Sequence, residues 1–163
     1  MISIRPATPA DIPAMTQVLT DIYNAGKRSA PGDESLVRSR YIERDHGISC
    51  LVAVDDMRGV VGFQSLIRAT HGNIYGAPEG WGVIGTHISP LAARQGIGRK
   101  LFQQTKAAAE RAALAYVEAL IALDNVEGQA YYESMGFRTY KAEQGAVGKC
   151  LTLTNVNSTK PAE

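Results

Sequence analysis

The sequence predicts one α/β domain with about seven strands and about four helices. Apolar residues recur at helical spacing in some segments, while other segments are short apolar runs typical of strands. In the second half of the chain strands alternate with helices, which favours α/β layers with at least one parallel strand pair. The 163 residues have the length of one ordinary domain, and no repeat, low-complexity tract or linker divides them.

The first elements are a short strand and a helix with a clear start. We expect the strand over Ile2–Arg5. Thr8 can cap the helix, Pro9 suits its first position, and Asp11 lies where a capping box has its acid. The apolar residues that follow recur every three or four positions: Ile12, Met15, Leu19 and Ile22.

The middle of the chain is expected to form a second helix and three strands. After a loop over Asn24–Gly32, a more polar helix is predicted over Asp33–Arg44. The strand-like runs are Ser49–Val54, Val60–Ile67 and Trp81–Ile88. The turn Asp55–Gly59 makes a hairpin of the first two runs, and the Gly-rich segment Thr70–Gly80 is irregular.

The last part of the chain alternates helices with strands. The predicted elements are a helix over Gly96–Ala113, a strand over Tyr116–Leu123, a helix over Asn125–Met135, and strands over Phe137–Ala142 and Val147–Thr154. The polar tail Asn155–Glu163 is expected to fray.

Composition and charge argue against several classes of function. A formal net charge of +1 gives no overall field that would attract nucleic acid or an anionic membrane. No apolar run approaches the roughly 20 residues that span a bilayer, and the N-terminus lacks a signal peptide. Neither Cys50 nor Cys150 fits a metal-ligand pattern, and the three histidines have no metal spacing. We therefore expect a cytoplasmic protein without a metal, in which any anion site is local.

The segment Ala93–Arg99, ARQGIGR, follows a strand and opens a helix with two glycines. The first backbone N–H groups of a helix have no intrahelical partner and lie at the positive end of the helix dipole. Glycine lets an anion approach those groups closely, and Arg94 and Arg99 add positive charge. A dinucleotide fingerprint would need glycine at Leu101, and a P-loop would need Lys and then Ser or Thr after Gly98. Either a phosphate-binding turn or an ordinary strand-to-helix turn remains.

A second motif, NVEGQAYYESMGF over Asn125–Phe137, begins after a strand and runs along the next helix. Asn125, Gly128 and Tyr132 are three and then four residues apart, so they lie along one helix face. Tyr131 points roughly 100° away around the helix and is expected in the core. Taken alone, a plain amphipathic helix with a glycine C-cap explains the segment equally well.

Together the two segments resemble the acetyl-CoA motifs of the GNAT acetyltransferase superfamily. The first family motif reads Q/R-x-x-G-x-G/A: Gly96 and Gly98 match its small positions, and Ala93 stands where Gln or Arg is usual. The second reads N-x-x-A/G-x-x-Φ-Y-x-x-x-G-F, where Φ is apolar or aromatic. It is matched at Asn125, Gly128, Tyr131, Tyr132, Gly136 and Phe137. The resemblance implies a GNAT-like fold, with a mixed, mostly antiparallel central sheet and a splayed parallel strand pair.

The resemblance also implies a site for acetyl-CoA as co-substrate. Pantetheine would lie between the splayed strands, against the backbone of Thr86, His87 and Ile88. The residues implied to hold the pyrophosphate are Arg94, Gln95, Gly96, Ile97, Gly98 and Arg99. Asn125 would bond the cofactor arm or the substrate, and Gly128 would leave room for it.

The implied reaction is direct attack of a primary amine on the acetyl group within a ternary complex. Tyr132 matches the general acid of the family, which protonates the leaving thiolate; the other interpretation is a packing tyrosine. The backbone N–H of Thr86 would lie near the acetyl oxygen. Several family members have Glu on the strand before the first motif, but Gly82 takes that position here. Glu79, His87 or a water relay would then accept the amine proton, although strand alternation favours a structural role for His87.

The acceptor amine is left open by these motifs. In this fold it would be bound by Ile22–Ser35, Thr70–Gly80 and the hairpin around Gln144–Gly148. Asp33 and Glu34 either attract a cationic amine or simply begin a helix. Size and motifs favour a small-molecule amine, as in the phosphinothricin and amino-acid acetyltransferases, and a homodimer is one expected assembly. The alternatives are a protein or peptide N-acetyltransferase and an acyl-CoA-binding module without catalysis.

Overall fold

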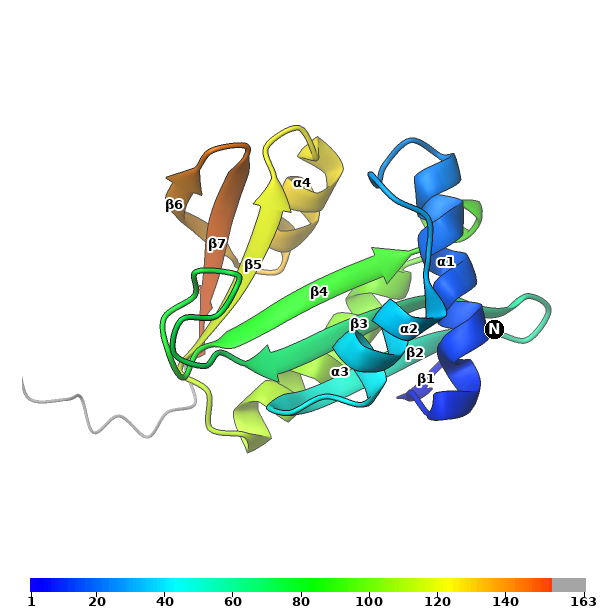
Figure 1. Ribbon diagram of the computed structural model, residues 1–163, viewed down its shortest axis with the longest axis horizontal. Coiled ribbons are helices and arrows are strands. Elements are labelled where there is room, and N and C mark those ends of the chain that lie inside the picture. The colour runs from blue at the N-terminus through cyan, green and yellow to red at the C-terminus, as the bar shows by residue number, and fades with distance from the viewer. Residues whose placement is uncertain (154–163) are drawn as a thin grey trace, which may run out of the picture.

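The computed structural model describes residues 1–153, which form one seven-stranded sheet with helices on both faces (Figure 1). The strands are β1 Ile2–Pro6, β2 Gly47–Asp55, β3 Gly59–Arg68, β4 Gly82–Ile88, β5 Tyr116–Ala122, β6 Arg138–Glu143 and β7 Ala146–Thr152. The helices are α1 Ile12–Asn24, α2 Glu34–Val37, α3 Ile97–Arg111 and α4 Val126–Ser134. The tail Asn155–Glu163, which was expected to fray, lies outside the described residues.

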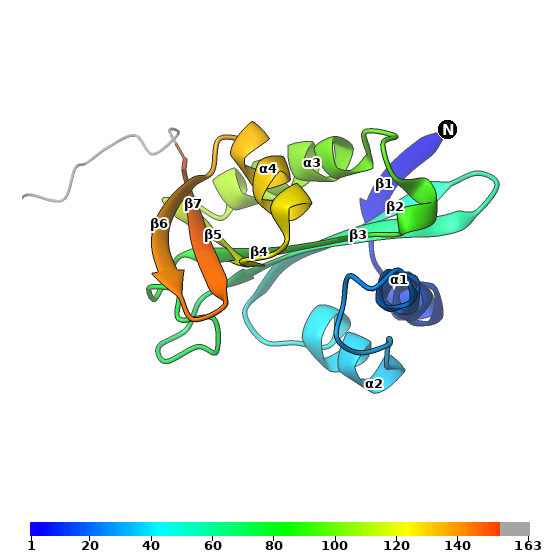
Figure 2. The same cartoon turned by 90° about the horizontal axis from the view of Figure 1, so that it is seen from above.

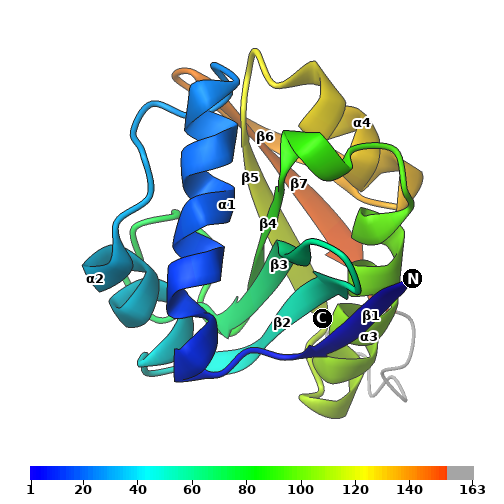
Figure 3. The same ribbon diagram turned by 90° about the vertical axis from the view of Figure 1, so that its right-hand side faces the viewer.

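Over residues 1–153 the sheet has the strand order β1-β2-β3-β4-β5-β7-β6, in which only β4 and β5 are parallel neighbours. The predicted fold class is therefore confirmed, and each strand begins and ends within a residue or two of its predicted bounds. Figure 2 shows α1 and α2 on one face of the sheet and α3 and α4 on the other. Figure 3 shows the same layers from the side, with α1 and α2 to the left of the sheet and α3 and α4 to its right.

The helix start predicted at Thr8 and Pro9 is a short 3-10 turn over Pro9–Asp11, and α1 follows it directly at Ile12. The turn is capped by Asp11. Its carboxylate accepts a hydrogen bond from the Thr8 N–H at 2.8 Å and pairs with Arg5 at 2.8 Å. The hydrogen bond from Arg5 is the main reason that the pKa of Asp11 lies below its usual value. The buried side chains of α1 pack on Val52 and Phe63, which fixes the helix on this face of the sheet.

The second predicted helix, Asp33–Arg44, is shorter and less regular than expected. Only Glu34–Val37 is α-helical, and Arg38–Ile42 continues as a wider π-helical turn. Asp33 caps this helix, because its carboxylate accepts a hydrogen bond from the Leu36 N–H at 3.1 Å. The Asp33 carboxylate therefore has the structural role that the sequence left as one of two alternatives.

Both faces of the sheet are packed, so its central strands form a rigid base. The α1 face buries residues that include Ile12, Met15, Leu19, Val37, Val52 and Phe63, and the α3 and α4 face buries Leu66, Ile84, Phe102, Leu114, Ile121 and Phe137. Each such side chain contributes about 1.5–3 kcal/mol when fully buried. Within residues 1–153, no helix has the length and apolar character needed to cross a bilayer.

Candidate functional site

Strands β4 and β5 pair only near their beginnings. The parallel pairing joins residues 82–83 of β4 to residues 117–118 of β5. Beyond these residues the strands diverge, as Figure 1 shows. We call the gap between residues 84–88 and 119–122 the fork. It leaves backbone N–H and C=O groups of two central strands without a strand partner, which is the splayed pair that the resemblance implied.

The backbone of Thr86 and Ile88 faces the fork. Ser89, just beyond β4, donates its N–H to the Val61 carbonyl at 2.8 Å, so its polar groups face β3. Backbone polar groups alternate along antiparallel strands, so those of His87 also face β3, whereas those of Thr86 and Ile88 face away from it. This corrects the expectation for His87, whose backbone is used within the sheet.

The turn before α3 presents a row of backbone N–H groups. Gly96 has a φ of 72° and directly precedes the helix. The first intrahelical bond joins the Lys100 N–H to the Gly96 carbonyl at 3.1 Å, so the N–H groups of residues 97–99 lie ahead of it. No atom lies within 4 Å of a Cβ built on Gly96, so the turn is open on that side. The side chains of Arg94, Gln95 and Arg99 are exposed around it.

Arg58, which lies outside both motifs, reaches this turn and also pairs with Asp55 at 3.4 Å. Its guanidinium donates to the Leu91 carbonyl at 2.7 Å and to Gln95 Oε1 at 3.1 Å. The β2–β3 hairpin that carries Arg58 is distant in sequence, which is why the motif alone could not reveal it.

Gly98 makes room for a tyrosine of α4 rather than for a phosphate. A Cβ built on Gly98 would lie 2.7 Å from Tyr131 Cε2, which real contacts do not allow. The Tyr131 hydroxyl donates to the Gly98 carbonyl at 2.8 Å. The expectation that both glycines open the turn to an anion is therefore corrected for Gly98. Its backbone N–H is still one of the N–H groups of residues 97–99 that lie ahead of the first intrahelical bond.

Two tyrosines of α4 reach into a buried hydrogen-bond network beside the fork. The Tyr132 hydroxyl lies 2.8 Å from Thr86 Oγ1. Gln64 Nε2 donates to Thr86 Oγ1 at 2.9 Å and to the Tyr131 hydroxyl at 3.1 Å. Tyr131, expected as a core residue, is half-buried and joins this network, because Gly98 lets its ring approach α3.

Tyr132 is a phenol that stays protonated at physiological pH. Its side chain is 7% exposed, and burial raises its pKa well above the ordinary value. Hydrogen bonds from the Thr86 side chain and backbone act in the opposite direction but are weaker. A neutral phenol at the edge of a strand gap carries a proton that a developing anion can take, and its raised pKa makes it a weaker acid than an exposed tyrosine.

Asn125 caps α4, and its side chain fills the space beside Gly128. Its Oδ1 accepts a hydrogen bond from the Gly128 N–H at 2.9 Å. A Cβ built on Gly128 would overlap the Asn125 amide. The gap expected at Gly128 is thus occupied by Asn125 in this structure.

Sequence comparison decides the family. A family model described as the acetyltransferase (GNAT) family matches residues 12–137. The chain belongs to the acetyltransferase (GNAT) family. The predicted family and the predicted enzyme class, an acetyltransferase, are both confirmed. No curated protein matches the chain.

Solved acetyltransferases share the fold at low sequence identity. The yncA protein of Salmonella typhimurium, described as an acetyltransferase and solved with its cofactor acetyl-CoA, is 20% identical over 96% of each chain, with a TM-score of 0.69. The ribosomal-protein-S18-alanine N-acetyltransferase of Escherichia coli is 17% identical over 97% of this chain and 99% of its own, with a TM-score of 0.73. A protein described as a phosphinothricin N-acetyltransferase is 16% identical over 92% of this chain and 96% of its own, with a TM-score of 0.70.

This acetyltransferase has no room for a carboxylate at the position where several family members have Glu. Gly82 is buried, and a Cβ built on it would lie 2.7 Å from Leu114 Cδ1. Glu79 is an exposed residue of the loop before β4 and lies 4.0 Å from His71. The His87 ring lies on the α1 face, 3.2 Å from the Tyr41 hydroxyl. The Tyr132 hydroxyl bonds Thr86 on the other face of β4. The sheet therefore lies between His87 and the hydrogen-bond network that contains Thr86 and Tyr132.

His87 makes the stability of the acetyltransferase depend on pH. Its pKa is lowered to about 4, because burial and the positive charges of Arg28 and Arg40 disfavour the imidazolium. The unfolded chain takes up this proton near pH 6.5, so the stabilisation is complete above pH 6.5 and is lost as the pH falls towards 4. Between pH 7 and pH 4.5 we expect a loss of about 2–3 kcal/mol from this group.

Urea unfolding of the wild type and of His87→Gln at the two pH values measures this loss. The variant has no titrating ring, so its stability should fall by about 2–3 kcal/mol less than that of the wild type. Equal falls in the two proteins would contradict the lowered pKa of His87.

The buried polar residues Gln64 and Glu118 were missed because each lies in a strand that is otherwise mainly apolar. Gln64 lies in the run VVGFQSLI, and Glu118 lies in YVEALIA. Glu118 accepts a hydrogen bond from the Tyr140 hydroxyl and lies 3.4 Å from Lys141 Nζ. Its neighbours Val117 and Ala119 pack in the core beside Tyr132, so Glu118 points to the opposite face and forms a compensated ion pair there.

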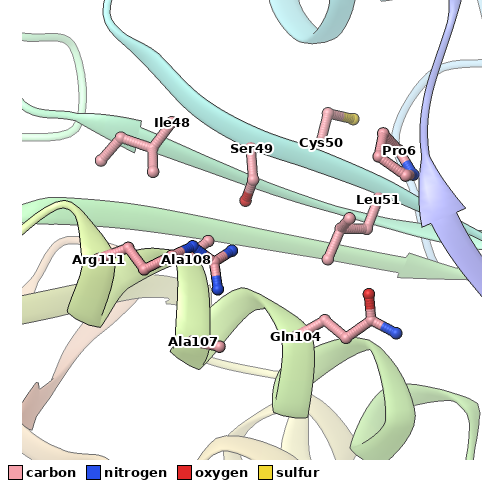
Figure 4. Close-up of a pocket in the computed structure, with 9 residues that line it drawn as sticks. All are labelled: Pro6, Ile48, Ser49, Cys50, Leu51, Gln104, Ala107, Ala108 and Arg111. Carbon is pink, nitrogen blue, oxygen red and sulfur yellow. The ribbon is translucent and has the colours of Figure 1, made fainter.

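A hollow of about 360 Å³ lies between β2 and α3, outside the fork (Figure 4). Gln104 and Arg111 reach over it from α3, while Cys50 points away from it. Burial raises the pKa of the Cys50 thiol to about 11, so this cysteine is not a nucleophile at neutral pH. The network beside the fork is the better candidate for chemistry.

Proposed function

We propose that this acetyltransferase moves an acetyl group from acetyl-CoA to a primary amine of a small molecule, by direct attack within a ternary complex. The observation that carries the proposal is the Tyr132 hydroxyl, a buried neutral phenol bonded to Thr86 at the edge of the fork. A thiolate leaving in the fork would find a proton donor there.

The residues around the fork fit acetyl-CoA. The strand edge at Thr86 and Ile88 offers unpaired peptide groups to pantetheine, which carries two amides. The N–H groups of residues 97–99 suit a pyrophosphate, and the exposed Arg94 and Arg99 add positive charge. The Salmonella typhimurium protein with the same fold was solved with acetyl-CoA, which supports this assignment. Gln95 and Asn125 are proposed to border the cofactor, with Gly128 behind Asn125.

In the proposed reaction the neutral amine attacks the thioester carbonyl and forms the C–N bond. The Thr86 N–H faces the fork and would stabilise the negative charge that develops on the carbonyl oxygen. When the C–S bond breaks, sulfur takes its electron pair and the Tyr132 proton. The amine nitrogen releases its extra proton to water, and Tyr132 is reprotonated from solvent. Among the described residues, the alternatives to Glu at Gly82 do not reach the network: Glu79 is exposed beside His71, and His87 lies beside Tyr41. Water is therefore the proposed proton acceptor.

The proposed acceptor is a small amine that enters beside the loop after α1. Lys27 of this loop pairs with Glu127 of α4 at 3.2 Å, so the loop borders the open side of the fork. The phosphinothricin N-acetyltransferase shares the fold, which supports this class; the enzyme that acetylates ribosomal protein S18 shares it too. A peptide acceptor is therefore one arm of the test. The homodimer and the cytoplasmic location stay predictions.

Two measurements test the proposed function. Acetyl-CoA should raise the melting temperature of the protein, because it binds the native state. Release of CoA thiol should then depend on an added amine, in a panel of amino acids, polyamines, aminoglycosides and peptides with a free N-terminus. No melting shift at millimolar acetyl-CoA would contradict the site. A shift without amine-dependent thiol release would instead indicate a binding module.

A further inference from the structure

We propose that Gln64 is a positioning residue that, through Thr86, turns the Tyr132 proton towards the leaving sulfur. The inference rests on the proposed function of Tyr132 as general acid. It concerns a side chain that does not touch the reacting atoms and lies on β3, one strand away from the fork.

The direction of each hydrogen bond in the network can be worked out from Gly98, because the role of its carbonyl is fixed. The Gly98 carbonyl can only accept, so Tyr131 uses its single proton there, at 2.8 Å. The Tyr131 oxygen must then accept from Gln64, which requires the amide nitrogen and not the amide oxygen to face it, at 3.1 Å. Tyr131 therefore fixes which way the Gln64 amide is turned.

The second N–H of the Gln64 amide is directed at Thr86. It points to Thr86 Oγ1 at 2.9 Å, so Thr86 accepts at that contact. The proton of Thr86 is then free for its other partner, the Tyr132 oxygen at 2.8 Å. If Thr86 donates to Tyr132, the proton of Tyr132 has no role in the network and is available in the fork.

The surroundings of Gln64 favour a role beyond packing. The side chain is fully buried, and among the described residues its Oε1 has no hydrogen-bond partner. A buried acceptor without a partner is destabilising, and an apolar side chain of similar size would avoid that cost. Gln64 also lies directly opposite Thr86 in the register of β3 and β4, so two central strands hold the pair rigidly.

Replacing Gln64 with Glu tests the direction of these bonds at nearly constant shape. A carboxylate only accepts, so Thr86 would donate to it, and Tyr132 would have to donate to Thr86. We expect kcat to fall about 30-fold or more at pH 8, because general acid catalysis is worth about 10²–10⁴-fold. The KM for acetyl-CoA should change little. The ratio of variant to wild-type kcat should rise as the pH falls, because protonated Glu regains a donor.

Three comparisons distinguish a positioning role of Gln64 from a purely structural one. Gln64→Met, which removes the donors without adding an acceptor, should lose less activity, with no pH dependence relative to the wild type. Gln104→Glu makes the same chemical change on the exposed side of α3 and should leave kcat unchanged. In a Tyr132→Phe background, Gln64→Glu should change kcat less than about twofold, because its effect acts through Tyr132. An equal loss in both backgrounds, or no loss at all, would overturn the proposal.

A measurement independent of activity keeps this inference separate from the proposed function. Neutron diffraction from deuterated crystals locates the deuteron between Thr86 and Tyr132. We expect it on Thr86 Oγ1; a deuteron on the Tyr132 oxygen, directed at Thr86, would overturn the inference. A wild-type protein that acetylates no amine would contradict the proposed function. The position of the deuteron would still show which way the Tyr132 hydroxyl is turned.

Discussion

Tyr132→Phe is expected to lower kcat for acetyl transfer about a hundredfold or more, while the affinity for acetyl-CoA changes little. The substitution removes one oxygen and the proton that the leaving sulfur would take, a contribution worth about 10²–10⁴-fold. The ring itself packs on Phe137 with centroids 5.1 Å apart, so the aromatic packing of α4 is retained. Because the pKa of Tyr132 lies above its ordinary value, the missing proton would have been present across the physiological pH range.

Steady-state kinetics with the best amine of the panel measures this effect, and a thermal-shift titration measures acetyl-CoA binding. Tyr116→Phe is the matched control, because Tyr116 lies at the closed end of the fork and is partly exposed. It should keep wild-type kcat. A large loss of acetyl-CoA affinity in Tyr132→Phe, with unchanged kcat at saturation, would mean that the phenol binds the cofactor instead of donating a proton.

The parts of the fold and of the site that could be predicted are those set by local backbone chemistry. A helix that begins after Gly96 needs free N–H groups at that point, and a capping acid at Asp11 needs only three residues of sequence. The positions of these features follow from spacing along the chain. The tyrosine of the second motif was located in the same way, because 3.6 residues per turn fixes its face relative to Asn125.

The parts that could not be predicted depend on contacts between distant segments. Gln64 faces Thr86 because of the register between β3 and β4, which no local pattern specifies. Tyr131 packs against the core as expected, but its hydrogen bond to the Gly98 carbonyl could not be predicted, because that carbonyl is 33 residues away on another helix. The same contact changes the interpretation of Gly98. From the sequence, this glycine was expected to let an anion approach the turn, but in the structure it makes room for the Tyr131 ring.

Gly96 is the position where charge and shape at the proposed pyrophosphate site can be tested separately. Gly96→Asp is expected to weaken CoA binding more than about a hundredfold, or about 2.8 kcal/mol. A carboxylate there would face the phosphates at the positive end of α3 and repel them. The fold should survive, because no atom lies within 4 Å of a Cβ built on Gly96.

Gly96→Asn is the matched control, because it has the same size as Asp and no charge. Gly96 has a φ of 72°, and Asn and Asp both tolerate this left-handed conformation better than other residues with a Cβ. Calorimetric titration with CoA should therefore show a much smaller loss for Asn than for Asp, and added salt should narrow the difference. Equal losses would assign the effect to bulk at the turn. Wild-type affinity in Gly96→Asp would place the pyrophosphate elsewhere, because a carboxylate beside the N–H groups of residues 97–99 must oppose a second anion bound to them.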